Sequence, residues 1–235
     1  MSIKNITYLD LIEACQKPGC LACTLTQEMV ESYIRMLFHE HINDLPSRDK
    51  LRHSQGLCYS HIWLAIDGQL GNALGVAIIS NDVVGKLLQD LNEIKFENNR
   101  LAKIRKFVNP GNNPSLLTPE KDCPVCLHQK MVKERVLKTL VANVQKQELS
   151  NAIRDSDGIC LPHLRQSLGM NASAPSHQLL LDLARDRWEK LSKELSEFIR
   201  KNDYRFSKEG FGSERDSWLR ATEVLKGNRP KKAQS

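Results

Sequence analysis

Two short motifs, each present twice, hold the side chains of this 235-residue chain that are best suited to bind a metal ion. The first is C-x2-C. The second is G-x-C-x2-H, whose cysteine is separated from the last cysteine of C-x2-C by 34 residues in one copy and 33 in the other. The motifs contain six of the seven cysteines and give two sets of three cysteines and one histidine: Cys20, Cys23, Cys58 and His61 in the first copy, and Cys123, Cys126, Cys160 and His163 in the second.

These residue types at these spacings favour zinc. Two cysteines separated by two residues can direct both sulfurs at one ion, and a C-x2-H pair at the start of a helix puts both ligands on one face, a turn apart. Three thiolates and one imidazole fill the four positions of a tetrahedral Zn²⁺ site. We therefore predict two zinc ions per chain, each bound by the four residues of one copy. An iron–sulfur cluster is the alternative for such thiolate-rich sites.

Other roles for the cysteines fit less well. Disulfides would leave an odd cysteine, Cys15, and would not explain a histidine at the same place in both copies. Cys15 itself is expected to be a small buried hydrophobe or a spare ligand. The N-terminal sequence MSIKNITYLDLIEAC lacks the basic and then apolar pattern of a signal peptide, so we expect a cytoplasmic protein with reduced thiols. The longest apolar run, 73–79, is too short to cross a bilayer, so we expect no membrane partner.

The segments around the motifs have helical spacing. Residues 24–43 carry an apolar stripe at three- and four-residue steps, and a similar stripe lies 103 residues later. His41 stands in the first stripe where the second has Val144, so it is either a core histidine or a polar residue placed for function. Long helices are expected over 72–106 and 176–202. Almost no stretch alternates as a strand does, and we predict an all-α fold of two tandem helical repeats, each stapled by its own Cys3His site. The ligands are presented as in a treble-clef site: two come from the C-x2-C motif, called the knuckle below, and two from a helix N-terminus. A treble clef has a β-hairpin between them, and no clear β-hairpin is predicted here.

A proline-rich segment separates the two copies. Residues 107–119 (FVNPGNNPSLLTP) contain three prolines and a glycine, as is typical of an interdomain linker. We therefore predict an N-terminal zinc-binding repeat over 1–106, a C-terminal one over 120–205, and a terminal helix with a basic disordered tail over 206–235. The two long helices are expected to pack on each other within the chain, with a dimer seam as the alternative, giving a monomer or a homodimer.

The paired motifs, with the segment Gly71-Asn72-Ala73-Leu74-Gly75-Val76-Ala77-Ile78 after the first C-x2-H pair, resemble an uncharacterised bacterial protein family. The resemblance covers roughly residues 15–205 and implies a bacterial cytosolic origin. No activity is established for that family, so the resemblance supplies no mechanism.

Three functions are compatible with these residues. A closed Cys3His quartet favours structural zinc in a binding module whose partner is a protein. The same cysteines could instead form a thiol and zinc redox sensor. The third possibility is an enzyme with a site near Glu40, His41 and Asp44, or Asp82, with zinc as a scaffold. No phosphate loop, nucleophile elbow or dinucleotide fingerprint supports that possibility.

The formal charge of +6 raises the question of nucleic-acid binding. Four basic residues lie in the last ten, with no acidic residue among them: Lys226, Arg229, Lys231 and Lys232. Without that tail the formal charge is only +2. Basic chain ends are commonly solubilising, so nucleic-acid binding through the tail is the alternative to a protein partner.

Overall fold

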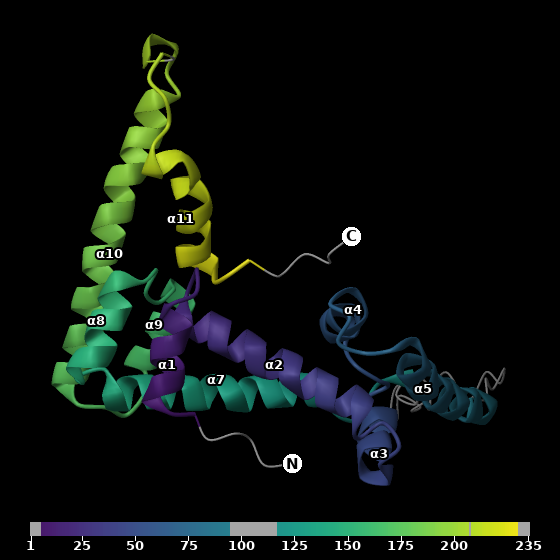
Figure 1. Cartoon of the computed structure of the whole chain (residues 1–235). Coiled ribbons are helices and arrows are strands. Elements are labelled where there is room, and N and C mark those ends of the chain that lie inside the picture. The colour runs from purple at the N-terminus through teal and green to yellow at the C-terminus, as the bar shows by residue number, and fades with distance from the viewer. Residues whose placement is uncertain (1–5, 95–116, 207, 230–235) are drawn as a thin grey trace, which may run out of the picture. The chain divides into compact units, whose positions relative to one another are not determined.

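The chain folds into helices (Figure 1). The computed structural model describes residues 6–94, 117–206 and 208–229. Every regular element in these ranges is a helix and none is a strand, which confirms the predicted all-α class. None of the described helices combines the length and the apolar character needed to cross a bilayer.

The same order of helices occurs twice. The first set comprises α1 (Tyr8–Cys15), α2 (Leu21–His39), α3 (Leu45–His53), α4 (Tyr59–Asp67) and α5 (Ala73–Glu93). The second set comprises α7 (Pro124–Asn143), α8 (Gln147–Asp155), α9 (Leu161–Leu168) and α10 (Ala174–Lys201). From α2 to α5, each helix start recurs 101 to 103 residues later, in α7 to α10. Two short 3-10 helices, η2 (Tyr204–Phe206) and η3 (Ser213–Asp216), and α11 (Ser217–Lys226) complete the described chain.

Two kinds of N-cap residue stand at the starts of α3, α4, α5, α9 and α10. Asp44, Asn72 and Ser173 cap α3, α5 and α10 in the usual way, because the side-chain oxygen of each accepts a backbone N–H of the first turn. The residues in the N-cap position of α4 and α9 are Cys58 and Cys160, whose side chains make no such capping bond. The helices that carry the C-x2-H pairs therefore begin with a thiol placed where an anion is stabilised.

The described chain forms two compact units that do not follow the order of the sequence. Among the described residues, unit 1 comprises 6–29, 129–206 and 208–229, and unit 2 comprises 30–94 and 117–128. The helices α2 and α7 each contribute to both units. The units thus differ from the sequential division at the linker 107–119 that we expected, because the buried stripe of each of these two helices serves two cores. Most of that linker lies outside the described residues.

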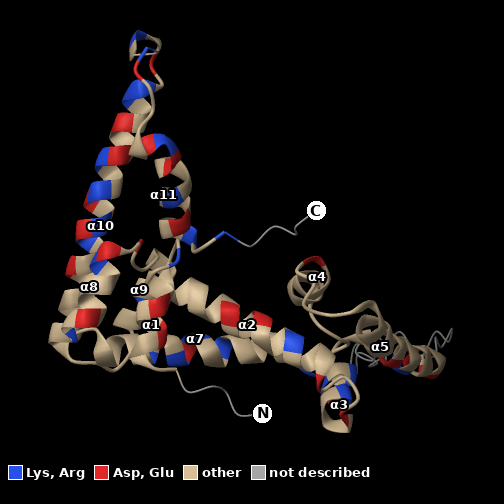
Figure 2. Ribbon diagram, in the orientation of Figure 1, with Lys and Arg blue, Asp and Glu red and all other residues tan. Residues whose placement is uncertain are grey.

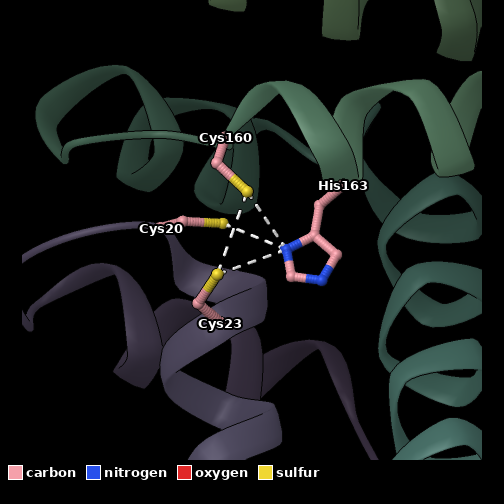
Figure 3. A group of neighbouring side chains, drawn as sticks. All are labelled: Cys20, Cys23, Cys160 and His163. Atoms are coloured by element: carbon pink, nitrogen blue, oxygen red, sulfur yellow. Dashed lines mark hydrogen bonds between the residues drawn. The ribbon is translucent and has the colours of Figure 1, made fainter. Parts of the chain in front are cut away.

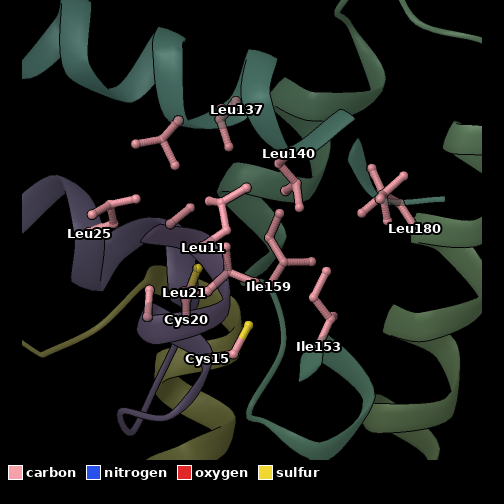
Figure 4. Packing of buried hydrophobic residues seen from close by; sticks show 14 of the residues in the cluster. Leu11, Cys15, Cys20, Leu21, Leu25, Leu137, Leu140, Ile153, Ile159 and Leu180 are labelled. Carbon is pink, nitrogen blue, oxygen red and sulfur yellow. The ribbon is translucent and has the colours of Figure 1, made fainter. Parts of the chain in front are cut away.

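The core of unit 1 combines the start of α2 with the later turns of α7 (Figure 4). Around them α1 contacts α8, and α10 contacts α8, α9 and α11. The largest side chains with almost no exposed surface here include Leu11, Leu21, Leu137, Leu140, Leu149 and Leu180. Burying such side chains stabilises the unit by roughly 1.5–3 kcal/mol each.

The core of unit 2 combines the later turns of α2 with the start of α7. Val30, Ile34 and Phe38 of α2 lie buried with Val125 of α7. The helices α3 and α5 contact each other. Arg48 of α3 also forms a two-pronged ion pair with Asp82 of α5, in which its Nε donates to the carboxylate over 2.6 Å.

Helices occur at both places where long helices were predicted, as α5 and α10. The described part of the first, α5, ends at Glu93, and the predicted remainder, 95–106, lies outside the described residues. The second, α10, covers nearly the predicted range. In unit 1 its apolar residues Ala184 and Leu191 are buried, and the helix contacts η3 and α11.

Two glycines of α5 provide a matched test of the packing in unit 2. A Cβ at Gly75 would lie 2.9 Å from the ring of Phe38, whereas a Cβ at Gly85 would have nothing within 4 Å. We expect Gly75→Ala to destabilise unit 2 by about 1–3 kcal/mol through overpacking. Gly85→Ala should stabilise it by about 0.5–1 kcal/mol, because alanine favours the helix. Denaturant unfolding followed by circular dichroism measures both, and equal shifts in the two variants would contradict the packing described.

Candidate metal centres

The eight predicted ligands come together in two groups, but the groups are not the predicted ones. Cluster 1 consists of Cys20, Cys23, Cys160 and His163, and cluster 2 of Cys58, His61, Cys123 and Cys126. In each cluster the ligand atoms all lie within 4.8 Å of one another. Each C-x2-C motif therefore pairs with the C-x2-H motif of the other copy. The sequence predicts that both motifs of one copy form one site, and the structure corrects this pairing.

Helix length explains the exchange. The 19 residues of α2 carry the chain about 28 Å away from Cys20 and Cys23, and the short α3 does not bring it back. The 20 residues of α7 span about 30 Å in the same way. In unit 1, however, the later turns of α7 share a core with the start of α2. The chain that leaves α7 through α8 therefore delivers Cys160 and His163 to the first knuckle.

Cluster 1 lies at the N-termini of two helices (Figure 3). Cys20 precedes α2 and Cys23 lies in its first turn, while Cys160 is the N-cap of α9 and His163 lies in the first turn of α9. Free N–H groups and the helix dipole stabilise negative charge at such ends, and thiolates there are favoured over thiols. Cys20, Cys160 and His163 are buried, and Cys23 is partly exposed.

Backbone contacts hold the two ligand-bearing loops of cluster 1 together. Leu21 N donates to Gly158 O over 3.2 Å, and Gly19 N donates to Asp157 Oδ2 over 2.8 Å. Arg187 of α10 forms an ion pair with Asp157. Gly158 has φ +74°, a left-handed conformation that glycine adopts at low cost, and this turn aims Cys160 at the knuckle.

The distances in cluster 1 match the edges of a tetrahedron around a metal ion. With typical zinc–sulfur and zinc–nitrogen bonds, neighbouring sulfurs lie about 3.8 Å apart, and sulfur and nitrogen about 3.6 Å apart. Cys23 Sγ and Cys160 Sγ are 3.8 Å apart, and His163 Nδ1 lies 3.3, 3.4 and 3.5 Å from the sulfurs of Cys160, Cys23 and Cys20 (Figure 3). The sulfurs are too far apart for disulfides, and all seven cysteines are free.

Cluster 2 has the same construction within unit 2. Cys58 is the N-cap of α4 and His61 lies in its first turn, while Cys123 precedes α7 and Cys126 lies in its first turn. Cys58 Sγ and Cys126 Sγ are 3.6 Å apart. His61 Nδ1 lies 3.1, 3.4 and 3.8 Å from the sulfurs of Cys58, Cys126 and Cys123.

The loops of cluster 2 are also tied by the backbone. Glu120 N and Lys121 N both donate to His53 O at the end of α3, over 2.9 and 3.1 Å. Gly56, with φ +86°, corresponds to Gly158 in the other copy. The glycine of the G-x-C-x2-H motif therefore has a structural role in both copies. In the same cluster, His128 of α7, just after Cys126, stacks on Tyr33 with ring centroids 4.1 Å apart.

The ligand side chains shift one another's pKa. Burial raises the pKa of Cys20, but contacts with Cys160, Cys23 and His163 outweigh it, and the pKa lies well below its ordinary value. Burial lowers the pKa of His163, yet hydrogen bonds with Cys160 and Cys20 raise it to about 9. In cluster 2, burial together with the neighbour Cys58 raises the pKa of Cys126 to about 12. Thiolates this close oppose one another's ionisation, and a bound cation allows all the thiols to release their protons.

The C-terminal segment contacts cluster 1 directly. Asn228 Oδ1 accepts from Cys20 N over 2.6 Å, Asn228 Nδ2 donates to Thr24 Oγ1 over 2.9 Å, and Asn228 N donates to Cys23 Sγ over 3.4 Å. A Cβ at Gly227 would lie only 3.2 Å from Cys23 Sγ. The sequence predicts a disordered tail here. In the structure, Gly227 and Asn228 lie against the knuckle of cluster 1. No sequence pattern predicts this contact, because Asn228 is a single polar residue beyond a helix end.

The sequence suggested an enzyme site near Glu40, His41 and Asp44, or Asp82. Asp44 accepts hydrogen bonds from the backbone and the hydroxyl of Ser47 and caps α3, while Glu40 is exposed and His41 is half-buried. Asp82 is engaged by Arg48. The packing thus gives two of these acidic residues, Asp44 and Asp82, structural partners, and it adds no support for an active site near Glu40, His41 and Asp44.

The remaining cysteine and the basic tail lie outside both clusters. Cys15 is buried in the core of unit 1, where burial raises its pKa to about 11. It is not among the grouped ligands, in keeping with a small buried hydrophobe. Of the basic tail, Lys226 and Arg229 are described, whereas Lys231 and Lys232 lie outside the described residues.

A family profile matches almost the whole chain. The profile of a family of unknown function, DUF6062, matches residues 1–232. The chain belongs to this family. The match extends beyond the motifs to α1, α11 and the C-terminal segment, so it covers the whole arrangement described above. No curated protein and no solved structure matches this member of DUF6062.

The exchanged pairing can be tested with one cysteine left in each motif. In a Cys15→Ala, Cys20→Ser, Cys123→Ser variant, mild oxidation with a chelator present should join Cys23 to Cys160 and Cys58 to Cys126, whose sulfurs lie 3.8 and 3.6 Å apart. Peptide mapping without reduction identifies the bonds. Disulfides from Cys23 to Cys58 and from Cys126 to Cys160 would show the sequential pairing instead.

The contact of Asn228 with the first knuckle generates a second prediction. Asn228→Ala leaves the buried N–H of Cys20 without its acceptor, which costs about 1–3 kcal/mol and favours local opening. We expect faster alkylation of Cys20 and Cys23, measured by mass spectrometry, with no change at Cys58 and Cys126. Arg229→Ala, which alters an exposed neighbour, is the matched control. Equal alkylation rates in both variants would show that Asn228 does not protect the knuckle.

Proposed function

We propose that this protein binds two zinc ions in structural Cys3His sites and serves as a protein-interaction module. The observation that carries the proposal is the geometry of the quartets. Each holds three sulfurs and one imidazole nitrogen within 4.8 Å of one another. Four protein ligands complete the coordination of a structural zinc and leave no open position for water or substrate. Soft thiolates with one imidazole favour zinc over magnesium, calcium or manganese.

The proposed ions connect parts of the chain that are far apart in sequence. Cys23 and Cys160 are 137 residues apart, and Cys58 and Cys126 are 68 residues apart. Constraining such long loops lowers the entropy of the unfolded chain. The ions would also fix where the starts of α2 and α7 meet those of α9 and α4. Zinc binding and folding are therefore expected to be coupled.

An exposed apolar face beside cluster 2 supports the interaction role. Tyr59, Trp63 and Ile66 follow one another at helical spacing along α4, with 80%, 46% and 39% of their surface exposed. The rings of Tyr59 and Trp63 meet edge to face, with centroids 6.3 Å apart. Tyrosine and tryptophan dominate the binding energy of many protein interfaces. Because α4 begins at Cys58 and His61, a metal in cluster 2 would hold the helix that presents this face.

Metal analysis of two histidine variants tests the proposal. Elemental mass spectrometry of protein purified without added metal should give two zinc ions per chain, one for each quartet. His163→Ala should reduce this to one, and Cys20, Cys23 and Cys160 should become reactive to alkylation while the cysteines of cluster 2 stay protected. His61→Ala should give the reciprocal pattern.

His39→Ala is the matched control, because His39 is exposed at the end of α2 and belongs to neither cluster. It should keep both ions. Iron with visible absorbance would replace zinc by an iron–sulfur assignment, and a metal content unaffected by His163→Ala would contradict the site itself.

A further inference from the structure

The helix α5 has two apolar faces, and only one of them is used within unit 2. Gly75 and Ile79 are buried towards the core, and Val76 and Val83 pack against it. The opposite face carries a second apolar row at steps of three and four residues, formed by Leu74, Ala77, Asn81, Val84, Leu88 and Leu91. All six residues are exposed, and the four largest apolar side chains keep between 50% and 72% of their surface in solvent.

The charges of α5 lie away from this row. The helix has four charged residues among its 21, against eleven among the 28 of α10, where they are spread along the length (Figure 2). Asp82 pairs with Arg48, and Lys86 pairs with the buried Asp90. None of the four belongs to the exposed row. An apolar row of this extent, on the order of a few hundred Å², is the kind of patch that marks an interface.

The spacing of the exposed row is that of a coiled-coil seam. Leu74, Asn81 and Leu88 fall at heptad position a, and Ala77, Val84 and Leu91 fall at position d. The residues that face the core of unit 2 fall at positions b, c, e and f. The a and d seam therefore points away from the unit, as a seam between two separate helices does. A single asparagine at an a position selects a parallel pair in register, because it then meets its own counterpart.

We propose that the exposed seam of α5 pairs two copies of this chain as a parallel two-stranded coiled coil, with Asn81 facing Asn81 of the second copy. Against an apolar partner, or in an antiparallel pair where a meets d, the Asn81 amide would be buried without a partner, which is unfavourable. The seam covers 18 residues, or about 27 Å, which is too short for an independent coiled coil. Packing in unit 2 already stabilises α5 as a helix, so the helix does not have to form when two copies of the chain associate.

Sedimentation velocity of the full chain over a concentration series tests the proposal. We expect a reversible dimer. Leu88→Asp should weaken it by at least roughly tenfold, because a carboxylate would enter the seam. Leu45→Asp is the matched control: Leu45 is 72% exposed in the same unit but lies on α3, off the seam, and the dimer should be unaffected. Circular dichroism confirms that both variants are folded.

Cross-linking then tests the orientation. Asn81→Cys should give a disulfide-linked dimer through residue 81, whereas Gln89→Cys, on the same helix at position b, should not. A chain that stays monomeric at all concentrations overturns the proposal, and so does a dimer that Leu88→Asp leaves intact. A dimer that cross-links through residue 89 and not through residue 81 overturns it as well.

Discussion

The length of two helices governs the rest of this structure. A knuckle at the start of a helix about 28 Å long cannot be completed by ligands that follow the far end of that helix, unless the chain returns over the same distance. Here α3 and α8 are too short to bring the chain back over that distance. Each knuckle is instead completed by the C-x2-H pair of the other copy, and α2 and α7 each contribute to two cores. Neither half of the sequence contains a complete site or a complete core.

The sequence revealed the ligands but not their pairing. The cysteines and histidines could be predicted because their types and spacings reflect local chemistry: two thiols on a knuckle, and a thiol and an imidazole on the first turn of a helix. The pairing depends on which helices share a core. The intervals of 34 and 33 residues between the two motifs of each copy are nearly equal, so they do not distinguish pairing within a copy from pairing between copies. The helix periodicity carried the missing information, because it already predicted about 20 helical residues between each knuckle and the next short helix.

Other features could not be predicted for similar physical reasons. Asn228 reaches the first knuckle from 208 residues away, and no local pattern encodes such a contact. The sequence does not show which face of α5 enters the core. That choice is set by Gly71 and Gly75, which leave room for the ring of Phe38 and so fix the rotation of α5 about its axis.

The two clusters share a ligand set but differ in their surroundings, and the difference bears on function. In cluster 1, Asn228 bonds to the knuckle, and Cys20 and Cys160 belong to the core of unit 1. Cluster 2 stands at the start of α4, whose next turns expose Tyr59 and Trp63. A metal in cluster 1 would mainly hold a core together, whereas a metal in cluster 2 would also position a surface. A duplicated site can diverge in this way without any change in its ligands, because the outer contacts determine what each ion holds in place.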